Sequence, residues 1–169
     1  AGKPLVFAHY YGMWFTHEDD PDHNLNWGMR WGHATMLKKA RRDPHIKKNY
    51  RHTAWKAVLR VSDPKDPKRI HVYQQTIKPD AKWRAAGVIH PFEVYLVMQA
   101  YTSREGAARA MTRVLRQGTD RVLTLDDGTA LDVGQAQVTA YYGHNVFYDY
   151  DDFQWDGLDR IKGQPKRPV

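Results

Sequence analysis

The sequence predicts an α/β fold: a single domain of three-layer type, built on a mainly parallel or mixed sheet, with an aromatic-rich N-terminal extension. Two observations predict it. Segments with strand patterning alternate along the chain with segments of helical spacing, which is typical of α/β sheets. With 169 residues, 41% of them hydrophobic, the chain is long enough to bury one core. We expect the extension to span residues 1–50 and the α/β domain residues 51–169.

The predicted extension consists of a strand, a polar loop and a basic helix. Residues 5–11 are mostly apolar and are followed by Gly12, which predicts a short buried strand. Residues 16–26 are almost entirely polar and predict a loop. Helical spacing near residues 36–42 places apolar and basic side chains on opposite faces, and Asp43-Pro44 ends that helix.

Three apolar segments open the α/β domain. Residues 55–61 alternate apolar and polar side chains, which predicts a half-buried strand with one apolar side. Its apolar side would carry Trp55, Ala57, Leu59 and Val61. The β-branched and aromatic residues at 70–77 favour a second strand. Residues 92–101 are apolar almost throughout, which fits either a buried helix or a strand. Because Pro91 suits the first position of a helix, we predict a helix there.

The following segment carries the signals of a capped helix. Thr102-Ser-Arg-Glu105 has the form of a capping box, apolar residues then recur at helical spacing, and Gly118 is placed as a C-terminal cap. Residues 121–125 and 136–142 predict two further strands, separated by a turn at Asp126-Asp-Gly128.

Charge and cysteine content limit the possible functions. The formal net charge is +7 and basic residues gather at 38–51, so this cluster either binds nucleic acid or forms a solvated helix face. No apolar run reaches the length of a membrane span. The absence of cysteine excludes disulfides, thiolate–zinc sites and a cysteine nucleophile within this chain. A start at Ala1 is consistent with a processed export signal, and so with the periplasm or secretion, and equally with trimming.

Gly143-His144-Asn145 forms the first candidate active site. The tripeptide follows the predicted strand at 136–142, and in open α/β sheets ligands bind beyond the carboxyl ends of strands. His144 can act as general acid or base near neutral pH. Asn145 can orient the imidazole, and Gly143 permits a sharp turn or the close approach of a substrate. The alternative is a histidine hydrogen-bonded in a tight turn.

The predicted elements from residue 70 onward are a strand, a long apolar helical region at 92–117, a strand at 121–125 and a strand that ends in Gly-His-Asn. Their order resembles the first half of the caspase–hemoglobinase fold of clan CD cysteine peptidases, over residues 70–169. The resemblance implies a hydrolase acting on a peptide or other small substrate, with His144 as the catalytic histidine and Gly143 as its neighbour. It also implies a cysteine nucleophile on the next strand. Since the chain has no cysteine, we expect either a fragment whose nucleophile follows Val169 or an inactive domain.

A second hypothesis is a metal-dependent phosphoester hydrolase or nuclease. Imidazoles and carboxylates are dense between residues 17 and 23, and such groups bind divalent ions that activate water. The candidate ligands are His17, Asp19, Asp20, Asp22 and His23, and either His9 or His33 would complete the set. The basic cluster at 38–51 would then lie near the phosphates. The alternative is a polar surface loop.

A third hypothesis is a non-catalytic module that binds nucleic acid or carbohydrate. Aromatic side chains are frequent in the first 31 residues, and exposed aromatic rings stack on sugars or bases. The set comprises Tyr10, Tyr11, Trp14, Phe15, Trp27 and Trp31. The alternative is that these rings fill the core, as aromatic residues of compact domains usually do.

Overall fold

The computed structural model describes residues 3–13, 20–29, 32–40, 55–62 and 66–143, and it confirms a single α/β domain with a mixed sheet. The large sheet contains β1 (Leu5–Gly12), β2 (Lys56–Ser62), β3 (Arg69–Ile77), β4 (Phe92–Tyr101) and β7 (Val138–Tyr142). A two-stranded sheet contains β5 (Val122–Thr124) and β6 (Ala130–Asp132). The α-helices are α1 (His33–Ala40), α3 (Ala81–Ala85) and α4 (Arg104–Gln117). Two short 3₁₀ helices are η2 (Pro21–His23) and η3 (Val133–Gln135). No helix in these described ranges is both long and apolar enough to cross a membrane.

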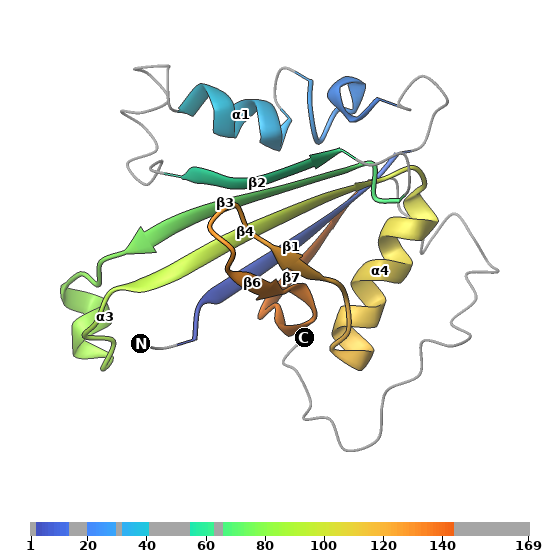
Figure 1. Cartoon of the computed structure of the whole chain (residues 1–169). Coiled ribbons are helices and arrows are strands. Elements are labelled where there is room, and N and C mark those ends of the chain that lie inside the picture. Colours follow the sequence, from blue (N-terminus) through green and yellow to red (C-terminus); the bar gives the residue numbers. More distant parts are fainter. Residues whose placement is uncertain (1–2, 14–19, 30–31, 41–54, 63–65, 144–169) are drawn as a thin grey trace.

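The large sheet has the strand order β2-β3-β4-β1-β7 (Figure 1). Strand β1 pairs in parallel with both β4 and β7, whereas β3 pairs antiparallel with β2 and β4. The carboxyl ends of β1, β4 and β7 therefore meet at one edge. The first strand, which the sequence assigned to an N-terminal extension ending at residue 50, lies inside the sheet.

Strand β4 corrects the helix that we predicted for residues 92–101. Its residues 94–101 pair with β1 on one side, and its residues 92–100 pair with β3 on the other. Side chains on both of its faces are buried, for example Val97 and Met98, so the alternation that marks a half-buried strand is absent. A continuous apolar run of this kind does not distinguish a central strand from a buried helix by its period.

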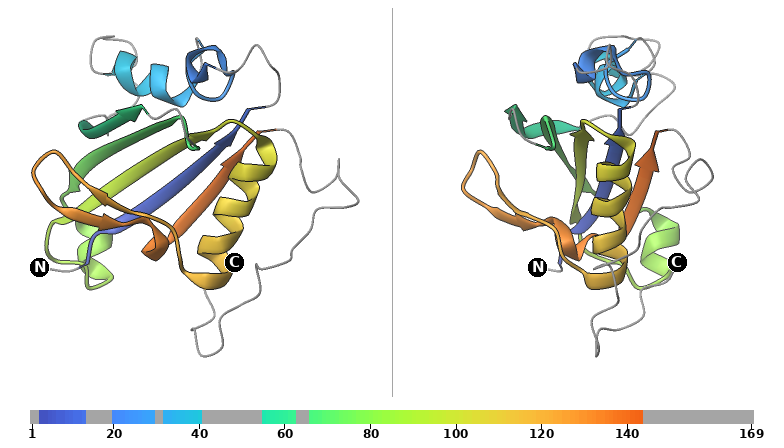
Figure 2. Two further views of the ribbon diagram at one scale, coloured as in Figure 1. Left: turned by 45° about the vertical axis from the view of Figure 1, so that its right-hand side comes forward. Right: turned by 90° about the vertical axis from the view of Figure 1, so that its right-hand side faces the viewer.

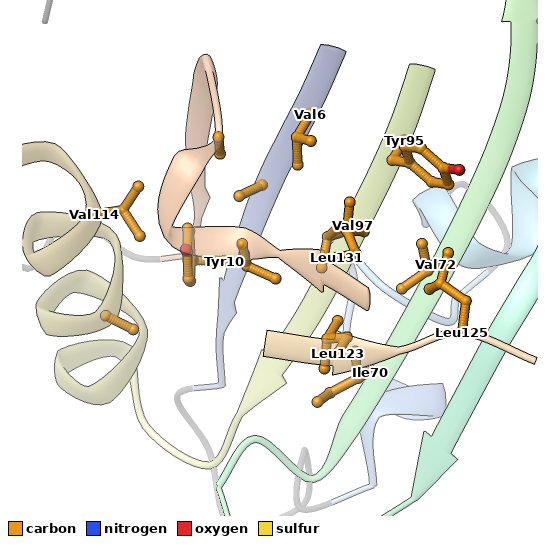
Figure 3. Packing of buried hydrophobic residues seen from close by; sticks show 14 of the residues in the cluster. Val6, Tyr10, Ile70, Val72, Tyr95, Val97, Val114, Leu123, Leu125 and Leu131 are labelled. Atoms are coloured by element: carbon orange, nitrogen blue, oxygen red, sulfur yellow. The ribbon is translucent and has the colours of Figure 1, made fainter. Parts of the chain in front are cut away.

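One face of the sheet packs against α4 and the β5–β6 hairpin, and we call it the helix-covered face (Figure 2). On β1 it carries Val6, Ala8 and Tyr10. Figure 3 shows the hairpin residues Leu123 and Leu131 over the sheet and Val114 of α4 beside them. These contacts form the larger of the two hydrophobic clusters.

Helix α4 ends at the glycine that the sequence indicated, but its N-cap is Ser103 and not Thr102, the first residue of the predicted capping box. Thr102 instead donates hydrogen bonds to the carboxylate of Asp66 from its backbone N–H and its hydroxyl. The Ser103 hydroxyl accepts a hydrogen bond from the backbone N–H of Gly106 at 3.0 Å, which satisfies one of the free N–H groups of the first turn. Gly118 ends the helix in the left-handed region with φ of 64°, a conformation that glycine adopts without steric penalty.

A β-bulge in β2 changes the predicted distribution of its side chains. The pairing with β3 shifts between Ala57 and Leu59, so Val58 is an extra residue on this strand. The predicted single apolar side is therefore wrong. Trp55 and Ala57 pack on one face of the sheet, whereas Leu59 and Val61 pack on the helix-covered face.

The opposite face, which we call the groove face, carries Leu5, Phe7, His9 and Tyr11 of β1. It is covered at the carboxyl end of β1 by Ala34 and Leu37 of α1 and by Trp27. These residues pack on Tyr11, Met98 and Ala100, which forms the second hydrophobic cluster. Toward the amino end of β1 the same face is hollowed into a groove.

Candidate binding groove and histidine cluster

The groove has a volume of about 870 Å³, within the range of about 300–1,000 Å³ usual for small-molecule sites. Its floor is formed by strands β1, β3 and β4, and its wall includes Trp55 and residues of α3 and its flanks. Most lining side chains are apolar. They are Leu5, Phe7, Trp55, Ile77, Trp83, Phe92, Val94 and Leu96. The polar lining consists of His9, Gln75, Thr76, Lys78 and Asp80.

The strand register explains why these residues share one surface. Phe7 lies beside Leu96 on β4, and Leu5 lies beside Val94. Because side chains alternate between the two faces of a strand, every second residue of β1 and β4 lies on the groove face. His9 is two residues beyond Phe7, so it lies at the inner end, next to the part of the face that α1 covers.

Charged groups gather at the opposite end, around α3. Residues 78–85 carry three cationic side chains, Lys78, Lys82 and Arg84, and one carboxylate, Asp80. Asp80 caps α3 by accepting a hydrogen bond from the backbone N–H of Trp83 at 3.0 Å. Trp83 also stacks on Phe92, with ring centroids 5.3 Å apart. Of the charged side chains, Lys78 and Asp80 line the groove, and Lys82 and Arg84 lie on the adjacent helix α3. The segment at this end of the groove is therefore aromatic and carries a net positive charge.

His9 belongs to a cluster of two histidines and two tyrosines. The Tyr11 hydroxyl lies 2.6 Å from Nδ1 of His33 and 3.4 Å from Nδ1 of His9. The Tyr142 ring stacks on Tyr11 at 4.9 Å and contacts both imidazoles, with centroid distances of 5.1 Å to His9 and 4.6 Å to His33. Three elements, β1, β7 and α1, thus supply one connected group of polar rings.

Burial sets the charge of this cluster. Desolvation, with a smaller contribution from neighbouring His33, lowers the pKa of His9 from 6.5 to about 4. Desolvation also lowers the pKa of His33, and it raises the pKa of the Tyr11 hydroxyl well above its usual 10. Both imidazoles and the phenol are therefore neutral at pH 7, so these side chains interact through hydrogen bonds between uncharged groups.

The structure describes only the first residue of the predicted Gly143-His144-Asn145 site. Gly143 is exposed and directly follows β7. A Cβ atom there would lie 2.7 Å from the Tyr141 hydroxyl and 3.0 Å from the carbonyl oxygen of Gly12. The atoms that approach Gly143 closely are therefore the protein's own, from Tyr141 and Gly12. His144 and Asn145 lie outside the described residues, so the caspase-like hypothesis stays a prediction.

The predicted metal loop is described in part. Asp20 caps η2 by accepting a hydrogen bond from the backbone N–H of Asp22 at 3.0 Å, and it lies 3.7 Å from Arg69. Asp22 and His23 are exposed. Within the part of the chain that the structure describes, no three histidine, aspartate or glutamate side chains form a metal site. His17 and Asp19 lie outside that part, so the metal hypothesis also stays a prediction.

The aromatic residues near the N-terminus are core residues where the structure describes them. Tyr10, Tyr11 and Trp27 are at most 1% exposed, with Tyr10 on the helix-covered face and the other two under α1. This agrees with the packing alternative and leaves no exposed stacking surface at these three positions. Trp14, Phe15 and Trp31, and most of the basic cluster at 38–51, lie outside the described residues.

Sequence reasoning missed the groove and its innermost residue. His9 entered the prediction only as an additional metal ligand, and neither Phe7 nor Trp83 was predicted as a site residue. One signal was present. In a strand spanning residues 5–11, alternation places Leu5, Phe7, His9 and Tyr11 on one face. The partners of that face come from β3, β4 and α3, and the strand pairing that assembles them was not predicted.

Comparisons with protein-family models, with curated proteins and with solved structures find no match to this chain.

Proposed function

We propose that this domain binds a small amphipathic organic anion, with the apolar body in the groove and the anionic group at the α3 end. The observation that carries the proposal is the groove itself, an apolar, aromatic-lined hollow on the sheet face. Lys78 lines its outer end, and Lys82 and Arg84 lie on the adjacent helix α3. An anion gains from this local charge, and an apolar body gains from leaving water.

The length of the groove sets the size of the ligand. From Phe92 at the α3 end to Met98 beside His9, β4 advances six residues, which at about 3.3 Å each spans about 20 Å. A single aromatic ring would fill only part of that length. An extended alkyl or aryl-alkyl carboxylate, such as a medium-chain fatty acid, fits better.

Chain-length dependence provides the first experiment. Binding of octanoate, decanoate and dodecanoate is measured by titration calorimetry below their micellar concentrations. Each buried CH₂ group contributes about 0.8 kcal/mol, so we expect affinity to rise about fourfold per CH₂ until the groove is filled. Failure of all three acids to bind, or affinities that do not change with chain length, would rule the proposal out.

Two variants locate the site. Phe7→Ala removes a ring from the groove floor and should weaken dodecanoate binding about tenfold. Lys78→Glu should weaken dodecanoate binding by about twofold or more and leave binding of the uncharged dodecan-1-ol unchanged. The matched control is Leu115→Ala, since Leu115 is 41% exposed on α4 and does not line the groove. Equal effects of Leu115→Ala and Phe7→Ala would place the binding site elsewhere.

A further inference from the structure

The two histidines of the cluster contact one hydroxyl group through the same ring atom, Nδ1. The Tyr11 hydroxyl lies 2.6 Å from Nδ1 of His33 and 3.4 Å from Nδ1 of His9. A tyrosine hydroxyl carries one proton, so it donates to one imidazole and accepts from the other. The neutral imidazole that accepts is protonated at Nε2, and the one that donates is protonated at Nδ1. This arrangement requires opposite tautomers at the two histidines.

The two distances assign the proton. The 2.6 Å separation is shorter than the usual N–H···O distance and matches an O–H donor, whereas the 3.4 Å separation fits the weaker, N–H donor bond of the two. Tyr11 therefore donates to His33, and His9 donates its Nδ1–H weakly toward Tyr11. His9 Nε2 is left as a lone pair on a residue that lines the groove.

We infer that His9 is a specificity-determining hydrogen-bond acceptor at the inner end of the groove, and that Tyr11 and His33 hold it in the tautomer with a free Nε2 lone pair. His9 selects amphipathic carboxylates that carry a hydrogen-bond donor at the end remote from the carboxylate. This inference rests on the proposed function, because it takes the groove to be the binding site. The proposed function places the anionic group of the ligand near Lys78. The inference about His9 adds a second polar end, a hydroxyl or N–H group that donates to His9. Tyr11 and His33 are positioning residues, since the groove lining includes neither.

The surroundings of His9 keep it an acceptor. The groups that face it are Tyr11 on its own strand, Tyr142 on β7 and His33 on α1, and all three are neutral at pH 7. Its neighbour on β4 is Met98, which has no titratable group. Burial opposes protonation of His9, so a cationic imidazole donor does not replace the neutral acceptor near neutral pH.

The ligand-independent test is nitrogen NMR of the histidine rings in the wild-type protein at pH 7. Chemical shifts and two-bond couplings of ¹⁵N-labelled imidazoles identify which nitrogen carries the proton. We expect Nδ1–H at His9 and Nε2–H at His33. Tyr11→Phe removes the shared hydroxyl and should return His9 to a mixture of tautomers. Identical tautomers at His9 and His33 in the wild-type protein would overturn the inference.

The ligand test compares 12-hydroxydodecanoate, which donates and accepts, with 12-methoxydodecanoate, which only accepts. The wild-type protein should bind the hydroxy acid about three- to tenfold more tightly, the range expected for one hydrogen bond. In Tyr11→Phe the ratio should fall toward one, because His9 can then present Nε2–H to the ether oxygen. The conservative His9→Gln variant, whose amide both donates and accepts, should lose the preference in the same way.

The outcomes separate the two proposals. If dodecanoate binds but the wild-type protein binds the hydroxy and methoxy acids equally, the inference about His9 fails and the proposed function stands. If none of the acids binds, both fail. Should Tyr11→Phe fold poorly, the NMR result on the wild-type protein and the His9→Gln titration still decide the question, since neither removes the Tyr11 hydroxyl.

Discussion

The Tyr11 hydroxyl, on the central strand β1, lies 2.6 Å from Nδ1 of His33, the first residue of α1. This contact attaches the covering helix to the sheet at the boundary between the buried and the hollowed part of the groove face. Tyr11 itself is fully buried, between the Tyr142 ring and Trp27. The same hydroxyl therefore holds α1 against the sheet and, by the inference above, fixes the tautomer of His9.

A double-mutant cycle measures this contact. Tyr11→Phe keeps the ring and removes the hydroxyl, and His33→Ala removes the imidazole. We expect a coupling free energy of about 1 kcal/mol between the two changes, the usual net value of a hydrogen bond. Urea denaturation of the four proteins gives the value. Strictly additive effects would mean that the hydrogen bond contributes nothing to the stability of the fold.

Acid should destabilise the protein through His9. Its pKa is 6.5 in an unfolded chain and about 4 in the folded protein, so the unfolded state binds more protons between these values. The stabilising contribution of the neutral imidazole is fully present above pH 6.5 and is lost as the pH falls toward 4. The loss is on the order of 3 kcal/mol. The lowered pKa of His33 acts in the same direction.

Urea unfolding between pH 7.5 and 4 checks this prediction against His9→Leu, which cannot be protonated. Carboxylates that titrate near pH 4 affect both proteins alike, so the difference between the two curves isolates His9. The wild-type free energy of unfolding should fall more steeply than that of His9→Leu from pH 6.5 downward. Parallel curves would show that His9 is protonated as easily in the folded state as in the unfolded one.

The sequence predicted the elements whose signal is local. The strand at 5–11, the strand at 70–77 and the helix between Ser103 and Gly118 form as expected, because alternation and capping depend on near neighbours. The element at 92–101 was predicted wrongly for a non-local reason. It became a strand because β1 and β3 pair on its two sides and bury both of its faces. A single apolar segment does not reveal those partners.

The candidate site was harder to predict for the same reason. Phe7, Trp55 and Trp83 are far apart in the sequence and meet only through the strand order and the position of α3. The β-bulge at Val58 is equally invisible to a period-2 pattern, yet it decides that Trp55 and Leu59 lie on opposite faces. The expectation of a site near the carboxyl ends of parallel strands led to residues 143–145, which stay a prediction. The histidine that lines the groove lies within β1, and strand-end reasoning does not point to it.

Helix α4 should depend on its two caps. Ser103→Ala removes the acceptor for the Gly106 N–H and should lower the free energy of unfolding by about 1 kcal/mol, whereas Ser103→Asp, which keeps an acceptor, should change it little. Gly118→Ala places a Cβ atom in the left-handed region and should destabilise by about 1 kcal/mol or more. Thermal unfolding of the three variants tests both ends. An unchanged melting temperature in Ser103→Ala would show that solvent replaces the cap.

The buried carboxylate of Asp120 provides the last prediction. Its side chain is 7% exposed, and Oδ2 accepts hydrogen bonds from the Tyr10 hydroxyl at 2.7 Å and from Gln99 Nε2 at 3.1 Å. Tyr10→Phe deletes the shorter bond and leaves the carboxylate with fewer donors in a buried position. Hydrogen bonds to charged groups contribute about 1.5–3 kcal/mol, and we expect a loss of that size in the free energy of unfolding.

The matched control for Tyr10→Phe is Tyr95→Phe, a tyrosine of the same helix-covered face. The Tyr95 hydroxyl accepts from Gln74 Nε2 at 3.2 Å, and that same nitrogen also donates to Glu93 at 3.0 Å, so loss of the hydroxyl leaves Gln74 with a partner. Tyr95→Phe should therefore destabilise by less than about 1 kcal/mol in the same urea titration. Both variants keep the buried ring, so equal losses of stability would mean that the bond from Tyr10 to the Asp120 carboxylate contributes no more than the bond between Gln74 and Tyr95.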